Sequence, residues 1–203
     1  NRIRSPASLF IHGFHPVPSR FPVAGADNMA TAVLIRLEEQ DMKPEAASMT
    51  HSPAGGIAPA HIIRQMVEQG HIVADAPLDA DQVQPASLDL RLGDVAWRVR
   101  ASFMPGRHNT VSDRLEQLSL HKIDLSQGAV LEVGCVYIVP LRDRLKLPKG
   151  MSAAANPKSS TGRLDIFTRV IADYATHFEQ VPDGYDGPLY AEIYRYQDAD
   201  GRW

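Results

Sequence analysis

The sequence has one cysteine, Cys135, among its 203 residues. A single cysteine cannot form a disulfide within the chain, and a reducing compartment, the cytoplasm, is the simplest location for such a protein. Zinc sites built from several cysteines are excluded as well. The eight histidines are scattered, with no H-E-x-x-H motif and no H-x-E paired with P-C-x-x-C. We therefore expect no zinc.

Long apolar runs and an excess of basic residues are also missing. No run approaches the roughly 20 apolar residues of a membrane-spanning helix. The start of the chain lacks the basic, apolar and small-residue order of a signal peptide. The formal net charge is −3, which provides no basic surface for nucleic acid. We expect neither a membrane nor a nucleic acid as a partner.

Turn-forming residues are abundant, with fifteen prolines and fourteen glycines. They separate short apolar segments at the spacing of roughly 8–12 residues that is typical of all-β proteins. Strands are predicted for residues 85–92, 95–99, 130–133, 135–141, 151–155, 166–172 and 189–193. A short amphipathic helix is predicted between Pro59 and Gly70, where apolar residues recur at helical spacing. These features predict a mainly β sandwich or distorted barrel with one short leading helix.

The beginning of the chain differs from the rest. Residues 1–56 are rich in proline and end in a Ser-Pro-Ala-Gly-Gly joint, so we interpret them as an N-terminal extension. Within this extension only residues 29–42 have helical character. The β domain is therefore expected in residues 57–203.

Two connections are predicted inside this domain. Gly93 and Asp94 separate two alternating segments and are expected to form a hairpin turn. Residues 102–121 carry only a weak pattern, and residues 104–109 are typical of a loop.

The clearest chemical signal is Lys-Ser-Ser-Thr-Gly-Arg at residues 158–163. Hydroxyls and backbone N–H groups donate to phosphate oxygens, Arg163 can bind them in a bidentate manner, and Lys158 adds a point charge. The order of a P-loop is absent, and the same residue types also form ordinary polar turns. Phosphate binding and a polar turn both remain open from this segment alone.

Glu192 is the candidate for acid–base chemistry. It lies in the apolar, alternating segment 189–193, where burial of a carboxylate is costly unless the group is paired or functional. A glutamate facing a pocket can take a proton from water and pass it to a leaving group. The alternative is a glutamate on the solvated face of a strand.

Three stretches in order resemble the dCTP deaminase family, which shares its fold with the trimeric dUTPases. Residues 158–164 resemble the family's Arg-Ser-Ser-x-x-Arg-Leu segment, and residues 85–93 its early strand ending in Asp-x-Arg-Leu-Gly. Residues 184–192 resemble its Gly-aromatic-x-Gly strand that ends in the catalytic glutamate. The resemblance covers roughly residues 57–193. It implies a distorted β-barrel or jelly roll of the dUTPase-like type.

The resemblance also implies an enzyme: a homotrimer or higher homo-oligomer with active sites between chains. It would deaminate dCTP by hydrolysis to dUTP and ammonia, without zinc and with Mg²⁺ bound through the triphosphate. Glu192 would deprotonate the water that attacks C4, while Ser159 and Arg163 would orient the water and the base. The implied substrate-binding residues are Lys158, Ser160, Thr161, Gly162, Ala172, Tyr190 and Ala191.

The sequence departs from the family pattern at several positions. Lys158 stands where arginine is usual, and Pro182 stands where dUTPases carry the aspartate that positions water, with Asp183 one place away. The spacing between Ala172 and Gly184 is longer than in compact members. A dUTPase-like pyrophosphohydrolase is therefore a second, less favoured alternative.

The C-terminal part is short as well. Residues 99–106 and 134–137 resemble a longer subgroup with two tandem halves, of which one is present. Only residues 193–203 follow the glutamate, whereas family members continue with further strands and a segment that closes over the nucleotide. A noncatalytic nucleotide-binding or assembly module is therefore the third alternative.

Overall fold

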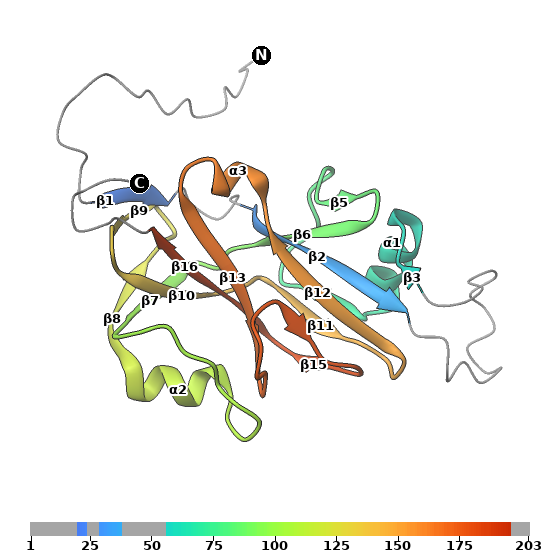
Figure 1. Cartoon of the computed structure of the whole chain (residues 1–203). Coiled ribbons are helices and arrows are strands. Elements are labelled where there is room, and N and C mark those ends of the chain that lie inside the picture. Colours follow the sequence, from blue (N-terminus) through green and yellow to red (C-terminus); the bar gives the residue numbers. More distant parts are fainter. Residues whose placement is uncertain (1–19, 24–28, 38–55, 196–203) are drawn as a thin grey trace, which may run out of the picture.

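A computed structural model of the chain describes residues 20–23, 29–37 and 56–195, and its strands pair antiparallel in four sheets (Figure 1). The largest sheet contains, in order, β14 (Gln180–Val181), β12 (Met151–Pro157), β2 (Met29–Leu37), β6 (Ser87–Arg91) and β5 (Val83–Gln84), with β3 (Gly56–Ile57) paired to β2. The second sheet contains β13 (Ile166–Ala172), β16 (Leu189–Arg195), β10 (Val136–Pro140), β7 (Val95–Val99) and β8 (Ser119–Asp124).

The remaining elements are shorter. A three-stranded sheet is formed by β15 (Asp186–Gly187), β11 (Asp143–Lys146) and β4 (Ile72–Ala74), and β1 (Arg20–Val23) pairs with β9 (Ala129–Glu132). The helices are α1 (Ala60–Glu68), α2 (Val111–Leu118) and the single turn α3 (Ser159–Gly162). The predicted mainly β architecture and the short helix between Pro59 and Gly70 are thus confirmed, although β2, a central strand of the largest sheet, precedes this helix. Among the described residues the sheets remain open, and none closes into a barrel.

The main core lies between the two large sheets. Alternate residues of β2, β6 and β12 contribute one side of it, including Val33, Leu88 and Ala153. Strands β10, β13 and β16 contribute the other side, including Val139 and Ala191. Because side chains alternate along a strand, the second sheet also presents an opposite face.

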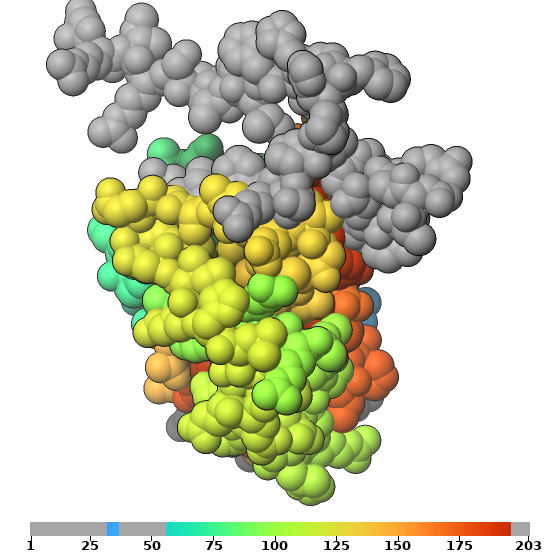
Figure 2. Space-filling model, turned by 90° about the vertical axis from the view of Figure 1, so that its left-hand side faces the viewer, coloured from blue at the N-terminus to red at the C-terminus, as the bar shows by residue number. Residues whose placement is uncertain are grey.

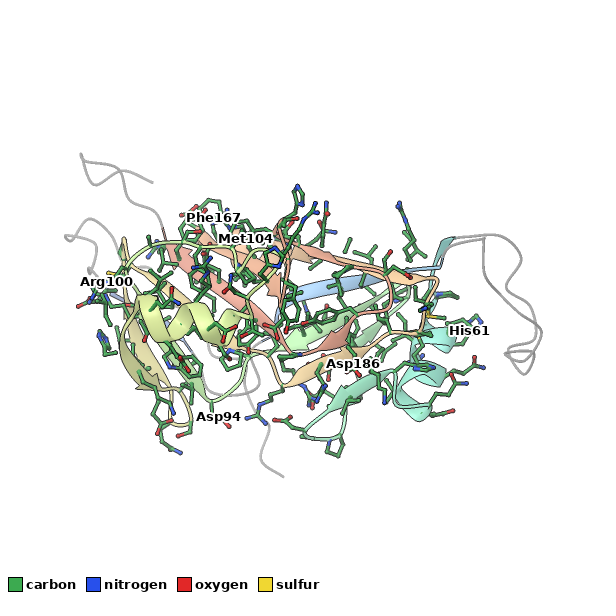
Figure 3. The ribbon with its side chains drawn as sticks, turned by 90° about the horizontal axis from the view of Figure 1, so that it is seen from below. His61, Asp94, Arg100, Met104, Phe167 and Asp186 are labelled. Atoms are coloured by element: carbon green, nitrogen blue, oxygen red, sulfur yellow. The ribbon has the colours of Figure 1, made fainter. Side chains whose placement is uncertain are left out.

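That opposite face carries a second buried cluster beneath α2. Val111 and Leu115 of the helix pack there with Ile138 and Ile171 of the sheet. Met104, labelled in Figure 3, packs against both clusters. The segment from β7 to β9, green to yellow, forms most of the face seen in Figure 2. The second sheet is therefore covered on both sides, and a charged group inside it has little access to water.

The helical prediction for residues 29–42 is wrong for the part that the structure describes. Residues 29–37 form β2, with β12 on one side and β6 on the other. Val33 and Ile35 are buried, whereas Arg36 is exposed, which is the two-residue period of a strand. Pairing on both edges favours the extended conformation over the local helical preference. Residues 38–42 lie outside the described residues.

The hairpin predicted at Gly93 and Asp94 is also wrong. The strands before and after these residues belong to different sheets, so the two residues cross from one sheet to the other. Gly93 N–H donates to the carbonyl of Pro140 at 2.8 Å, and a Cβ at Gly93 would lie 2.7 Å from that oxygen. The glycine therefore permits a close approach of two backbones.

Replacing Gly93 with alanine tests this interpretation. The new methyl group overlaps a backbone oxygen that cannot rotate away, so we expect Gly93→Ala to lower the free energy of unfolding by about 1–3 kcal/mol in urea titrations. Gly56→Ala is the matched control, because a Cβ at Gly56 would have no heavy atom within 4 Å. Equal stability of the two variants would contradict the close approach.

The weak pattern at residues 102–121 hides the helix α2, although the loop predicted at residues 104–109 is confirmed. A capping box begins the helix: Asp113 N–H donates to Thr110 Oγ1 at 3.1 Å, and the Asp113 carboxylate accepts from Thr110 N–H at 2.7 Å. Asp173 adds a further acceptor for Val111 N–H at 2.7 Å. These contacts satisfy N–H groups that the first helical turn leaves free.

The capping box predicts a pH dependence of stability. Hydrogen bonds from the Thr110 backbone and side chain hold the pKa of Asp113 below the ordinary aspartate value of 3.8. A lowered pKa in the folded state means that the stabilisation is present above the unfolded-state pKa and is lost as the pH falls through the folded-state pKa. In urea unfolding, the stability difference between the wild type and Asp113→Asn should shrink between about pH 5 and pH 3. A constant difference would contradict a charged cap.

Candidate functional site

Glu192 lies in the interior of the second sheet. Its strand, β16, runs between β13 and β10, and Glu192 is paired with Arg169 on one side and Ile138 on the other (Figure 1). Its side chain is fully buried, with a relative exposure of 0%. Since Ile138 belongs to the cluster beneath α2, the carboxylate points toward that cluster. The alternative of a solvated face residue is therefore wrong.

Arg169 is the residue that pairs with this carboxylate. Its Nε–H donates to Glu192 Oε1 at 3.1 Å, and its Nη2 forms a short ion-pair contact with the same oxygen. The second oxygen, Oε2, is buried and has no hydrogen-bond partner. A buried charged oxygen without a donor is costly in a structural role. The carboxylate thus has one oxygen bound by Arg169 and one buried oxygen that accepts no hydrogen bond.

The guanidinium of Arg169 is itself held by several groups. It lies 3.9 Å from the ring centre of Phe178 and 5.5 Å from that of Tyr194. Its Nη2 also donates to Ser102 Oγ at 3.2 Å. Sequence patterns alone did not identify Arg169. The signal was present in a charged residue inside the apolar segment 166–172, but its pairing with Glu192 depends on the strand register.

The residues predicted to bind phosphate lie at α3, between β12 and β13 (Figure 1). Ser159, Ser160, Gly162 and Arg163 are exposed. Thr161 Oγ1 donates to the carbonyl of Lys158 at 2.7 Å. These residues form one polar turn at the surface, with hydroxyls and a guanidinium open to a ligand.

Lys158 is the exception in this turn. Its ammonium forms a short ion pair with Asp89, whose side chain is almost entirely buried. Asp89 thus joins the early strand β6 to the start of α3. Among the described residues, no hydrogen bond joins Glu192 to Ser159 or Arg163. A single chain therefore brings together Glu192 with Arg169, and Lys158 with Asp89, as two separate groups.

The other three predicted substrate contacts lie along β13 and β16. Ala172 and Ala191 are buried in the main core, so only their backbone groups remain for the contact that the resemblance implies. Tyr190 lies on the same face as Glu192, and its hydroxyl is 3.2 Å from Ser112 Oγ. Burial raises the pKa of Tyr190. Its phenol is therefore a neutral hydrogen-bonding group near Glu192.

The Gly-aromatic-x-Gly segment has a structural explanation. Tyr185 is buried, its hydroxyl donates to the carbonyl of Pro188 at 2.5 Å, and it accepts from the N–H of Asp173 at 3.1 Å. A Cβ at Gly187 would lie 2.6 Å from that hydroxyl oxygen. Gly184 has a φ of 64°, which favours glycine. These residues position the start of β16 and thereby Glu192.

The early motif Asp-x-Arg-Leu-Gly is explained in the same way. Arg91 and Asp143 form a buried ion pair of 2.9 Å, and Asp143 also accepts from Arg91 N–H at 2.9 Å and from Gln82 Nε2 at 3.2 Å. Arg91 donates in addition to the carbonyls of Ala76 and Pro77. The motif thus consists of an ion-pair partner of Lys158, a buried structural arginine and the close-contact Gly93.

A pocket of about 540 Å³ lies elsewhere, between the outer faces of β2 and β12 and the connection containing Tyr174 and His177. It contains none of the predicted site residues. We therefore place the candidate site at Glu192 and not at this pocket, because the residues that line the pocket include no buried reactive side chain comparable to Glu192.

The part of the chain that the structure describes was searched for clustered metal ligands and for membrane-spanning helices. These residues contain no group of three or more His, Cys, Asp or Glu side chains placed to hold a metal ion. No helix in the same ranges is long and apolar enough to cross a membrane.

The two large sheets, the buried glutamate on a central strand and the hydroxyl-rich turn define a mainly β protein with a carboxylate-centred site. The model of one family, the N-terminal domain of 2'-deoxycytidine 5'-triphosphate deaminase, matches residues 54–197. The chain therefore belongs to the dCTP deaminase family, which confirms the resemblance.

Individual relatives agree with this assignment. "dCTP deaminase, dUMP-forming" from Methanobrevibacter smithii is 27% identical over 134 residues, which cover 64% of this chain and 65% of the relative. "dCTP deaminase" from Halorubrum lacusprofundi is 28% identical over 139 residues, covering 68% and 65%.

A solved structure, 2'-deoxycytidine 5'-triphosphate deaminase from Agrobacterium tumefaciens, is 60% identical to this chain with a TM-score of 0.68. The match covers 70% of this chain and 42% of that protein. The chain thus spans about two fifths of the solved protein's length.

Proposed function

We propose that this chain carries the catalytic glutamate of a dCTP deaminase, which converts dCTP and water to dUTP and ammonia. The observation that carries the proposal is the arrangement of Glu192: a buried carboxylate with Oε1 bound by Arg169 and Oε2 without a donor. An oxygen with free lone pairs is what a general base must present to a water molecule.

The proposed proton transfers take place between one water molecule, the substrate and the Glu192 carboxylate. Glu192 Oε2 takes a proton from water, and the hydroxide oxygen forms a bond to C4 of the cytosine. The tetrahedral intermediate then receives that proton on its amino nitrogen. The C4–N bond breaks and ammonia leaves, while the proton of the C4 hydroxyl moves to N3, so that the C4 oxygen becomes the carbonyl of uracil. Glu192 ends the cycle as a carboxylate.

The exposed turn at α3 supplies the remaining roles. Ser159 and Arg163 would orient the water and the base, and Ser160, Thr161 and Gly162 would donate to the phosphates. Mg²⁺ would arrive with the triphosphate as part of the substrate. Lys158 would contribute its charge beside the phosphates, although its ammonium is already paired with Asp89.

We also propose that the site is completed between subunits of a homotrimer. The polar turn is exposed and makes no hydrogen bond to Glu192 within the described chain. A second subunit would bring such a turn to each glutamate. A nucleotide substrate fits the cytoplasm, the compartment indicated by the single cysteine.

Burial of Glu192 has a consequence for substrate entry. Its side chain has no exposed surface in the single chain, so water and the base reach Oε2 only when neighbouring side chains move. Exclusion of bulk water strengthens the electrostatic interactions inside such a site.

The proposal is tested by incubating the protein with dCTP and Mg²⁺. We expect loss of cytosine absorbance and release of one ammonia for each dCTP consumed. Binding of dCTP in calorimetry without ammonia would instead support the noncatalytic nucleotide-binding module.

A second product is favoured by the names of several relatives, which are described as dUMP-forming. A dUMP-forming enzyme also releases pyrophosphate, as a dUTPase-like enzyme does from dUTP. Pro182, where dUTPases carry an aspartate, argues against this step here. Pyrophosphate from dCTP or dUTP would establish it, whereas an intact triphosphate in the product supports dUTP as the end point.

A further inference from the structure

Phe178 and Glu179 lie in the connection between Ala172 and Gly184. Phe178 lies over the guanidinium of Arg169 at 3.9 Å and is partly buried in the cluster beneath α2. Glu179 follows at once; burial raises its pKa, and the charge of Arg169 opposes that rise. This connection therefore contacts Arg169, the residue that pairs with the proposed catalytic glutamate.

The backbone of this connection is held in place at some cost. Glu179 has a φ of 65° and Tyr174 a φ of 62°, a region that residues other than glycine rarely adopt. Glu179 N–H donates to the carbonyl of Val170, and its own carbonyl accepts from Ala155 N–H, both at 2.8 Å. Residues in such conformations persist where the surrounding structure requires them. The two hydrogen bonds of Glu179 thereby fix the neighbouring Phe178 against the buried cluster beneath α2.

We propose that Arg169 is a positioning residue for deamination, and that Phe178 holds its guanidinium so that Glu192 turns Oε1 to the protein and Oε2 to the substrate. This inference rests on the proposed function. Arg169 does not itself touch the reacting atoms; it acts through Glu192.

The contacts of Arg169 explain why its guanidinium must be held in place. We call the packing of Phe178 over this guanidinium the clamp. Both contacts of the guanidinium go to the same oxygen, Oε1, so they fix the rotation of the carboxylate. The side chain of Arg169 is 33% exposed, and without a ring over it the guanidinium is free to turn toward water or Glu179. Tyr194, which stacks on Phe167 (labelled in Figure 3), supplies a second ring at 5.5 Å from Arg169.

A loss of the clamp should appear in turnover and not in substrate binding. If Glu192 samples several rotations, fewer molecules present Oε2 correctly at any moment. The value of kcat therefore falls, whereas KM, which reflects the nucleotide contacts at α3, stays the same. A cation–π contact of this kind at a partly desolvated site corresponds to about a tenfold effect.

The variants to compare are Phe178→Leu, Phe178→Tyr and Arg169→Lys. We expect Phe178→Leu to lower kcat about tenfold with KM changed less than about twofold, and Phe178→Tyr to restore kcat because it keeps the ring. Arg169→Lys keeps the charge but loses the planar fork, so its kcat should fall further. Phe103→Leu is the matched control: Phe103 packs in the same cluster, and its loss should leave kcat unchanged.

A second readout does not depend on activity. The Nε–H signal of Arg169 in ¹⁵N NMR, identified by its absence in Arg169→Lys, should be protected from exchange in the wild type and in Phe103→Leu. It should be lost in Phe178→Leu. If Phe178→Leu does not fold, the kinetics of Arg169→Lys test the positioning role of Arg169. A lower kcat with an unchanged KM supports that role, and an unchanged kcat contradicts it.

The possible results separate the two proposals. A wild type that releases no ammonia overturns the proposed function, and the NMR signal alone then decides whether the clamp exists. A wild type that deaminates dCTP, with kcat and the Nε–H signal unchanged in Phe178→Leu, overturns the clamp and leaves the function standing.

Discussion

Glu192→Gln should lower kcat for dCTP deamination by a factor of about 10²–10⁴, the range typical of general acid–base catalysis. Glutamine has nearly the same shape as glutamate and keeps an oxygen for Arg169, but it cannot accept a proton from water. Binding of dCTP, measured by calorimetry, should change little, because the predicted phosphate contacts lie at α3. Turnover is measured as ammonia released per enzyme.

Glu132→Gln is the control for this substitution. Glu132 pairs with Arg98 at 2.6 Å and is partly exposed, so the same exchange of carboxylate for amide at this position should leave turnover near the wild-type value. Turnover by Glu192→Gln at the wild-type rate would remove Glu192 from its proposed role.

The second large effect concerns stability. Asp143→Ala should lower the free energy of unfolding by about 3–5 kcal/mol, because it leaves the charge of Arg91 buried without its carboxylate. The side chains of Arg91 and Asp143 are 5% and 0% exposed. The same substitution also removes the acceptor of Gln82 Nε2. Urea unfolding followed by circular dichroism measures the change.

Asp186→Ala provides the matched comparison. Asp186 pairs with Arg144 at 3.0 Å, but both side chains are 51% exposed. Exposed ion pairs contribute about 0–1 kcal/mol because water and salt screen them. A similar loss of stability in the two variants would show that burial does not determine the importance of the Arg91–Asp143 pair.

Most of the second sheet could be predicted from the sequence. The apolar or alternating segments of β7, β10, β13 and β16 carry their own signal, as does β9 in the separate two-stranded sheet, because side chains that face a core recur every second residue. The same applies to α1, whose apolar stripe faces the main core. Patterns within ten residues are sufficient where burial on one face determines the structure.

The errors arose where distant residues determine the structure. Residues 29–42, with their alanine and leucine and with Glu38 and Glu39, resemble a helix, yet pairing with β12 and β6 makes residues 29–37 a strand. Gly93 was interpreted through its neighbours in sequence, whereas its constraint is the carbonyl of Pro140. The start of α2 does carry a local signal, Thr110 followed three residues later by Asp113, which the weak apolar pattern around it obscures.

The candidate site shows the same division. The apolar segment and the family motif predict Glu192 from the sequence. Arg169 becomes its partner only through the register of β13 and β16, and Phe178 reaches Arg169 only because the connection after Ala172 folds back over it. Lys158 was predicted from its residue type to bind phosphate, and its ion pair with Asp89 required two distant segments to be placed side by side. The type of a residue thus predicts the chemistry of its side chain, whereas its ion-pair and hydrogen-bond partners are determined by the fold.

The most direct test of the proposed deamination follows the oxygen of water. The protein is incubated with dCTP and Mg²⁺ in H₂¹⁸O, and the product nucleotide is analysed by mass spectrometry. We predict one ¹⁸O in the uracil base, an unlabelled triphosphate, and no labelled base with Glu192→Gln. An unlabelled base, or label found only in phosphate, would contradict hydrolytic deamination at C4 by this site.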